Sequence, residues 1–390
     1  MEFGGVEMMS RVSFVFCLCV LALVCGCGSR SGVGAAKKGM AAFKDGRYEK
    51  AIALFSKAAE RIPNSPELYY HLGLAHLEHG NLDPALEALQ AALELRPAEG
   101  EANILGAMGQ VAYHQKAYTN AVAALERALE VSQDDATTVR VLTTLGAVEV
   151  CRKNPDLACL HYLRALKLDR KYAPAYYNLA VLYQDQYNLY EEALDQLEMF
   201  VRMVEKKDRK RDMAENRIKR LSQKIGTPAN VSRNSTRAAS LLQDGVNAYV
   251  AKQFPKAIKA YKDALVADPQ TFSAALGLGE VYVKQGMRAE ALEAFKRAAD
   301  INPTHQYSYH QAADLALQLK QPADASKILI KAIARSPYNA ASMRLMAQAC
   351  HAQARIPEAR AYGEFYLSLV PANEPGRAQY ESWVRSLKQK

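Results

Sequence analysis

The chain has 390 residues, of which 49% are hydrophobic and 23% charged, a composition that excludes an intrinsically disordered protein. Its formal net charge of +9 would by itself allow a nucleic-acid or anionic membrane partner. Residues 203–224, however, hold nine Lys or Arg against four Asp or Glu, so over half of the excess lies in one segment. A nucleic-acid footprint along the whole chain is therefore not expected.

The pattern of residues 1–26 predicts a signal peptide. Val12 to Val24 form a nearly unbroken apolar run of 13 residues behind the positive Arg11. A membrane-spanning helix needs about 20 apolar residues, so the run fits a cleaved signal better than a permanent span. A start at Met8 or Met9 would remove the two glutamates that precede them. Which methionine starts the natural chain stays open.

The signal segment ends Val24-Cys25-Gly26-Cys27-Gly28. This ending resembles the lipobox of bacterial lipoproteins, in which a small residue precedes a cysteine that is lipidated and becomes the new N-terminus. The resemblance implies lipidation of Cys27 and a lipid-anchored location in the cell envelope. Gly28 after the cysteine favours the outer membrane, facing the periplasm, over the inner one. The alternative is ordinary cleavage of a secreted protein. Residues 27–34 are expected to be a short flexible tether.

A repeated pattern fills most of the remaining chain. An alanine recurs with a large apolar residue four positions later, a second alanine seven positions later and often a proline twelve positions later. A glycine often stands twelve positions before it. The first alanines of these units are Ala51, Ala85, Ala121, Ala158, Ala193, Ala257, Ala291, Ala325 and Ala359.

The spacing of these alanines is 34 to 37 residues, apart from one gap of 64. The spacing and the small and bulky positions resemble the tetratricopeptide repeat. The resemblance implies an all-α fold, an α-α superhelix (solenoid) of about nine helix-turn-helix repeats, each with a helix A followed by a helix B. Small residues let the two helices of a repeat pack closely, and the proline prevents helix B from continuing.

Two repeats depart from the pattern at the same position. Phe200 and Tyr366 stand where the other repeats carry the second alanine, and each is followed by an amphipathic stretch, at 214–224 and 377–389. We interpret these stretches as capping helices that close two sub-arrays. The predicted organisation is five repeats over 32–202, a basic capping helix and linker over 203–237, four repeats over 238–371 and a C-terminal capping helix over 372–390. One continuous superhelix with a long inserted helix is the alternative.

The sequence contains no phosphate loop, zinc-protease, serine-hydrolase or paired-cysteine motif in its mature part, so we expect no catalytic residues and no cofactor. His71, His76 and His79 crowd one predicted helix, but no third ligand is evident and no metal site is expected. Cys151, Cys159 and Cys350 are an odd, scattered set and indicate packing residues rather than disulfides.

By the same resemblance, partners bind on the concave face formed by the A helices. The positions expected to point into this groove are Tyr70, Gln110, Tyr113, His114, Tyr177, Gln184, Tyr249, Glu280, Lys284, His310, Asp314, Arg344, Gln348 and His351. Tyrosines mixed with polar groups are typical of surfaces that bind peptides and proteins. The Lys/Asn clamp with which cochaperones of this family hold an acidic carboxyl terminus is missing, because its first-repeat positions carry Ala36 and Met40.

The resulting hypothesis is a non-catalytic scaffold or adaptor in the bacterial cell envelope that binds proteins or peptides, as in secretion, pilus or cell-wall assembly. The alternatives are a self-associating structural or trafficking lipoprotein and an accessory subunit of an envelope enzyme complex. The basic run at 206–220 has two interpretations, a surface for anionic partners or a solvated helix face. The repeat does not identify the partner, because it supplies a surface and not a chemistry.

Overall fold

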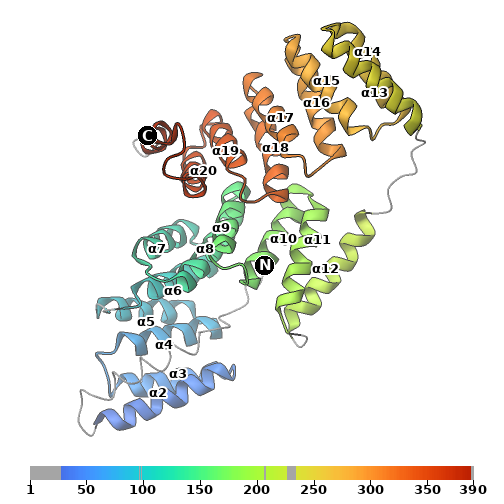
Figure 1. Cartoon of the computed structure of the whole chain (residues 1–390). Helices are drawn as coiled ribbons and strands as arrows, with labels where there is room; N and C mark the ends of the chain where they lie inside the picture. The colour runs from blue at the N-terminus through green and yellow to red at the C-terminus, as the bar shows by residue number, and fades with distance from the viewer. Residues whose placement is uncertain (1–27, 96, 98, 206–207, 226–233, 388–390) are drawn as a thin grey trace. The chain divides into compact units, whose positions relative to one another are not determined.

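The computed structural model describes residues 28–95, 97, 99–205, 208–225 and 234–387 (Figure 1). Within these ranges all regular secondary structure is helical. The helices are α2 (Gly28–Lys44), α3 (Tyr48–Ala59), α4 (Pro66–His79), α5 (Leu82–Glu94), α6 (Glu101–His114), α7 (Tyr118–Val131), α8 (Asp135–Cys151), α9 (Pro155–Leu168), α10 (Ala173–Tyr187), α11 (Tyr190–Met203), α12 (Arg209–Ile225), α13 (Ser235–Val250), α14 (Phe254–Ala267), α15 (Phe272–Lys284), α16 (Arg288–Ile301), α17 (Gln306–Gln318), α18 (Pro322–Arg335), α19 (Ala340–Ala352), α20 (Ile356–Leu369) and α21 (Arg377–Ser386).

The chain divides into two compact units. One contains residues up to Leu182 together with Met199–Arg211, and the other contains Tyr183–Glu198 together with the residues from Asp212 onward. This division runs through α10 and α11, whereas the sequence placed the boundary between the sub-arrays at 203–237. The boundaries predicted for the two sub-arrays are not tested by this division and stay a prediction. The predicted signal peptide and Cys27 lie outside the described residues.

In six repeats a glycine of helix A packs against the bulky residue of helix B. A Cβ atom added at any of six such glycines would lie only 2.5 to 3.0 Å from the facing side chain. The pairs are Gly39 with Phe55, Gly73 with Leu89, Gly109 with Leu125, Gly146 with Tyr162, Gly245 with Tyr261 and Gly279 with Phe295. The bulky partners are almost fully buried. The close approach expected from the pattern is thus present, and the bulky residue fills the space over the glycine of its own repeat.

The turns between helices A and B require a residue in the left-handed backbone region. Gly46 and Gly286 fill this position with φ of 71°, at no steric cost. Other repeats use a non-glycine residue, such as Lys153 (φ 64°), which stands two residues before Pro155. Pro155 is then the first residue of α9, where its missing N–H leaves no helical hydrogen bond unmade.

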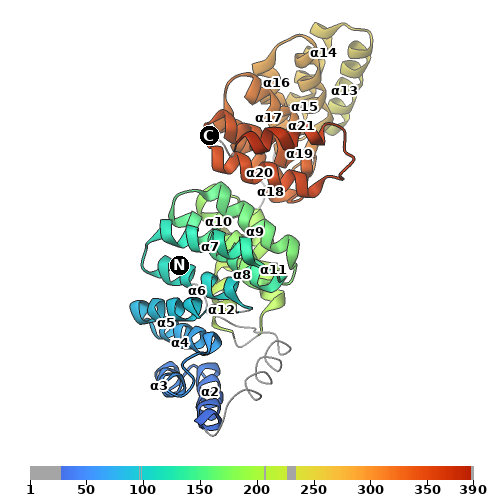
Figure 2. The same ribbon diagram turned by 90° about the vertical axis from the view of Figure 1, so that its left-hand side faces the viewer.

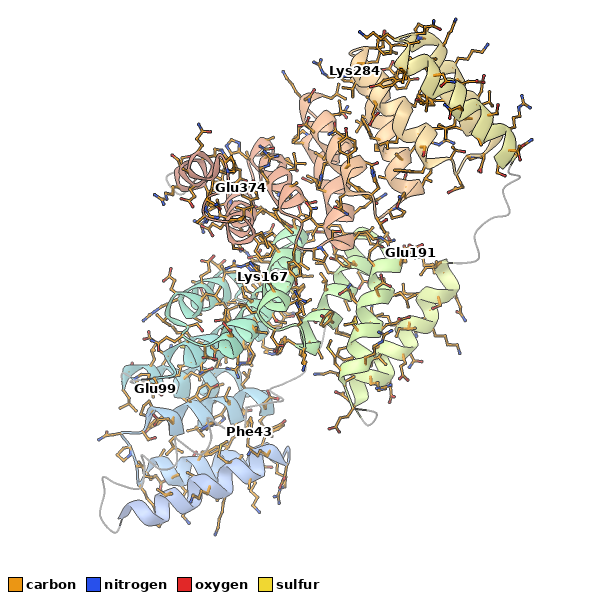
Figure 3. The ribbon with its side chains drawn as sticks, viewed as in Figure 1. Phe43, Glu99, Lys167, Glu191, Lys284 and Glu374 are labelled. Atoms are coloured by element: carbon orange, nitrogen blue, oxygen red, sulfur yellow. The ribbon has the colours of Figure 1, made fainter. Side chains whose placement is uncertain are left out.

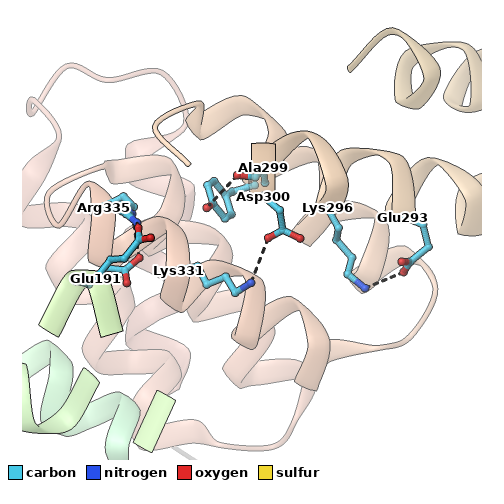
Figure 4. Close-up of polar contacts among 9 residues, drawn as sticks. Glu191, Glu293, Lys296, Ala299, Asp300, Lys331 and Arg335 are labelled. Atoms are coloured by element: carbon cyan, nitrogen blue, oxygen red, sulfur yellow. Dashed lines mark hydrogen bonds and ion pairs between the residues drawn. The ribbon is translucent and has the colours of Figure 1, made fainter. Parts of the chain in front are cut away.

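In each unit the A helices of successive repeats contact one another as well as their own B helices. These A-to-A contacts join α2 with α4, α4 with α6 and α6 with α8 in the first unit, and α13 with α15 and α17 with α19 in the second. We call the surface formed by the A helices of each unit its A face. Ion pairs bind neighbouring B helices as well: Lys331 Nζ of α18 lies 3.3 Å from Asp300 Oδ1 of α16 (Figure 4).

Helices α12 and α21 begin with the same capping contact. The Arg211 guanidinium donates to the carbonyl oxygens of Val201 (2.8 Å) and Val204 (3.0 Å), at the end of α11. Arg377 does the same to Leu367 (2.7 Å) and Val370 (2.6 Å), at the end of α20. Each arginine follows its two acceptors by the same 10 and 7 residues. A cation that satisfies the last carbonyls of a helix also stabilises its negative end.

Close packing against α20 also holds α21 in place. Gly363 stands where the earlier repeats carry the bulky residue, and a Cβ there would lie 2.7 Å from Val384 Cγ2. Helix α21 packs against α20 (Figure 2), and Val384 in α21 and Leu387 directly after it are buried. Both predicted capping stretches therefore form single amphipathic helices, bounded at Arg209–Ile225 and Arg377–Ser386.

The conformation predicted for residues 28–34 was wrong where the structure describes them. These residues form the first turns of α2 instead of a flexible tether. The reason is a packing contact that composition does not reveal: Gly32 lies against Ile62 at the end of the same hairpin, close enough that a Cβ would come within 2.7 Å of its side chain.

Candidate functional site on the A face

A polar cluster lies on the A face of the first unit. Thr137 Oγ1 of α8 donates to Asn103 Oδ1 of α6 (2.9 Å), and the Arg140 guanidinium reaches both Asn103 Oδ1 and Thr137 Oγ1 (3.2 Å to the latter). Among the residues that the structure describes, Arg140 has no ion pair. Burial raises the pKa of the Tyr70 hydroxyl, and the positive charge of Arg140 partly offsets this.

The predicted groove residues Tyr70 and Gln110 line the hollow over this cluster. The hollow has a volume of only about 30 Å³, which is room for about one water molecule. This part of the A face therefore offers hydrogen-bonding groups at a nearly closed surface and no deep pocket.

A larger hollow lies on the A face of the second unit, between α19 and α21. Its volume is about 440 Å³. The predicted groove residues Arg344, Gln348 and His351 of α19 line one side, and Tyr380 and Trp383 of α21 line the other. The structure thus brings together three of the predicted residues and adds two that the sequence had suggested only as parts of a cap.

The other predicted groove residues of the first unit are dispersed. Tyr113 contacts Cys151, whose Sγ lies 3.8 Å from its hydroxyl, and burial raises the pKa of that hydroxyl. His114 is exposed beside it, and partial desolvation lowers its pKa. Tyr177 packs its ring against Phe200 of α11, with centroids 5.2 Å apart.

Gln184 is not a free groove residue. Its side-chain oxygen accepts a hydrogen bond from Arg217 of α12 (3.0 Å), and Arg217 also lies 3.5 Å from Asp185. The capping helix therefore engages the side-chain oxygen of Gln184, and its role in a groove stays a prediction. The sequence could not show this, since the two residues are 33 positions apart.

The remaining predicted residues of the second unit lie along α13, α15 and α17. Tyr249 packs on Phe254. Burial, with a smaller contribution from the charge of Glu280, raises the pKa of Tyr261 and Tyr307. Lys284 is exposed in the last turn of α15 (Figure 3). Two more have partners within the array: His310 Nε2 lies 2.8 Å from Ser342 Oγ, and Asp314 accepts from Gln318 Nε2 at 2.7 Å.

The three clustered histidines of α4 have separate surroundings. His71 stacks on Phe55, with centroids 6.0 Å apart, and burial lowers its pKa to about 4. His76 contacts Asn81 in the following turn (3.4 Å). In the part of the chain that the structure describes, no group of three or more His, Cys, Asp or Glu side chains is placed to hold a metal ion.

Part of the basic run at 206–220 is engaged in internal contacts. Arg211 caps α11, and Arg217 binds Gln184 and Asp185. Lys219 and Arg220 stay exposed on α12. The internal contacts account for Arg211 and Arg217. For the exposed residues of the run both interpretations stay predictions.

The structure is an array of two-helix repeats, in which a small residue of one helix packs against a bulky residue of the next. This arrangement defines a helical-repeat protein that works through its surface. Models of the tetratricopeptide repeat match residues 36–100, 100–171, 242–305 and 310–374. The chain belongs to the tetratricopeptide-repeat family. Proteins of this family serve as protein-interaction scaffolds, and they are generally non-catalytic adaptors.

Similar sequences include Superkiller complex protein 3 of Mus musculus, which is 26% identical over an alignment of 284 residues that covers 68% of this chain and 17% of that protein. Superkiller protein 3 of Schizosaccharomyces pombe is 29% identical over 167 residues, 40% of this chain and 12% of that protein. The chain spans less than a fifth of the length of these relatives.

Among solved structures, PilF of Pseudomonas aeruginosa matches 67% of this chain and 99% of its own, at 20% identity and a TM-score of 0.40. YrrB, described as a tetratricopeptide-repeat protein with an unusual peptide-binding site, matches 68% of this chain and 97% of its own, at 20% identity and a TM-score of 0.31. At such TM-scores these similarities say nothing about what this chain binds.

Proposed function

We propose that this protein is a non-catalytic scaffold that binds peptide segments of partner proteins on its A face and is held in the bacterial cell envelope by a lipid on Cys27. One observation carries the binding proposal. On the A face of each unit lies an arginine that makes no ion pair with any described residue. Arg140 lies beside Tyr70, and Arg344 lies beside Tyr380. A cation without an acidic partner, set among tyrosines and amides, is suited to an acidic or polar peptide from outside.

Site-specific photocrosslinking tests this proposal. A photoreactive residue at Gln110 or Gln348, both on A helices, is expected to capture partner proteins in cells of the natural host. The matched control is Lys327 on helix B α18, whose side chain is 78% exposed and which is expected to give no adducts. Adducts formed only with other copies of this chain would contradict the scaffold and support the self-associating alternative.

The envelope anchor rests on the sequence, because Cys27 lies outside the described residues. No helix within those residues is both long enough and apolar enough to cross a membrane. We expect Cys27→Ala to move the protein from the membrane fraction to the soluble fraction after cell lysis. The control Cys25→Ala leaves the proposed lipidation site intact and is expected to stay with the membrane. Membrane association that survives Cys27→Ala would refute the anchor.

A further inference from the structure

The hollow between α19 and α21 has the size and the walls of a ligand site. Its volume of about 440 Å³ lies within the range of about 300–1,000 Å³ that is usual for such sites. Four rings form a connected wall. The centroids of Tyr366 and Tyr380 are 4.7 Å apart, those of Tyr380 and Trp383 are 4.9 Å apart, and those of His351 and Trp383 are 5.7 Å apart. Aromatic walls of this kind bind apolar and planar groups.

The hollow also holds a cation with no acidic partner. Arg344 is exposed and makes no ion pair with any residue that the structure describes. The nearby carboxylate of Glu381 is engaged elsewhere, by Arg377 at 2.9 Å and by Arg385 at 3.7 Å. The guanidinium of Arg344 is therefore free to form the two parallel hydrogen bonds with which arginine binds a carboxylate.

A second polar group in the wall lacks a partner. The hydroxyl oxygen of Tyr380 is covered, and within the described ranges it has no hydrogen-bond partner. Because this oxygen is covered, a ligand in the hollow meets the ring of Tyr380 and not its hydroxyl group. Arg344 and Tyr380 both line the hollow.

Capping alone does not require this arrangement. The first cap follows the same plan 166 residues earlier, with Arg211 in the role of Arg377 and Leu221 buried like Leu387. At the position of Tyr380, however, it carries the small Ala214. Arg217 and Asp185 form an ion pair there in the register where the second cap has Trp383 and His351. Helix α12 caps its array without such rings. The rings of α21 are therefore not needed for capping and are available for a different role.

We propose that this hollow binds a peptide segment of a partner protein in which an acidic side chain stands next to an aromatic one. The carboxylate binds Arg344, and the aromatic side chain packs against Trp383 and His351. A neutral sugar would use the rings and leave the cation unpaired, and inorganic phosphate would use the cation and leave the rings bare. Of these three ligands, only a segment with an acidic and an aromatic side chain engages both the guanidinium of Arg344 and the rings. This assignment rests on the proposed scaffold function and specifies its ligand in the second unit.

The test uses the full chain and Trp383, its only tryptophan. Short peptides, blocked at both ends and containing Asp-Phe or Glu-Phe, are expected to change Trp383 fluorescence on titration. Peptides with Asn-Phe or Asp-Gly in the same frame are expected to bind at least about tenfold more weakly, since one loses the charge and the other the ring. Arg344→Gln is expected to remove the preference of Asp-Phe over Asn-Phe, and Arg344→Lys to retain part of it.

The control Lys327→Gln, on a B helix, is expected to bind as the wild type does, and circular dichroism shows whether each variant keeps its helices. Saturation of Trp383 by a neutral disaccharide or by inorganic phosphate, with no response to the peptides, would overturn the assignment. So would equal binding of Asp-Phe and Asn-Phe peptides. If no peptide binds while Gln110 still captures partners, this inference fails and the scaffold stands; if Gln110 and Gln348 both capture nothing, the scaffold itself fails.

Discussion

Acidification from about pH 7.5 to about pH 4 is expected to lower the free energy of unfolding by about 3 kcal/mol through His161 alone. His161, on α9, is only 7% exposed, and its Nδ1 has no hydrogen-bond partner among the described residues. Burial, with a smaller contribution from the positive Arg164, lowers its pKa from 6.5 to about 3. The folded protein therefore holds His161 neutral where the unfolded chain would protonate it.

The sign follows from proton binding. Because the pKa is lower in the folded state, the unfolded state binds more protons as the pH falls below 6.5, and stability is lost from there down towards pH 3. Above pH 6.5 the contribution is fully present. His71, with its pKa lowered to about 4, acts in the same direction over a narrower range.

The measurement compares urea denaturation of the wild type and His161→Leu at both pH values. Leucine keeps the apolar volume and does not titrate, so the variant is expected to lose about 3 kcal/mol less stability on acidification. The difference between the two proteins removes the carboxylates that titrate in both. An identical loss in the two proteins would show that His161 is not held neutral by the fold.

A side chain at Gly146 is expected to cost about 3 kcal/mol of stability when it is as large as leucine. A Cβ atom there would already lie 2.5 Å from Cε1 of Tyr162, and that ring is 2% exposed. A buried ring has no room to turn aside, so Gly146→Leu must separate α8 from α9. The cost arises from lost packing between the two helices of one repeat.

Gly34→Leu is the matched control. Gly34 also lies in a helix, α2, but a Cβ at this position meets no atom within 4 Å. This variant is expected to keep or slightly raise stability, by up to about 1 kcal/mol, because leucine favours helix more than glycine does. Urea midpoints measure both effects. Hydrogen exchange should locate the loss in α8, α9 and their neighbours, because repeats stabilise one another only through adjacent contacts. Equal midpoints for the two variants would contradict the tight glycine contact.

The repeat could be predicted from the sequence because its determinants are local and periodic. Gly146 and Tyr162 stand at fixed positions in one hairpin, and the same pairing recurs as Gly279 with Phe295. A pattern that repeats every 34 residues or so identifies helix pairs without knowledge of their surroundings. The left-handed conformation of Lys153 could not be predicted in this way, because lysine carries no signal for it.

The candidate site could be predicted only in part. Arg344, Gln348 and His351 follow helical spacing on one A helix, so their common face was predictable. The position of Tyr380 and Trp383 opposite them depends on how α21 folds back, which the spacing within α21 does not specify. The Asn103, Thr137 and Arg140 cluster was missed, because its members come from two helices and form no motif within either.

The sequence by itself determined the repeat, its pairs of helices and the two places where the pattern breaks, because each depends on contacts between residues a few turns apart. Only the tertiary structure decided which exposed side chains are already engaged, such as Gln184 with Arg217, and which are left over, such as Arg344. That distinction depends on which charges and rings meet across helices more than 30 residues apart. Periodicity fixes the face on which a residue lies, and packing between distant helices fixes whether it has a partner there.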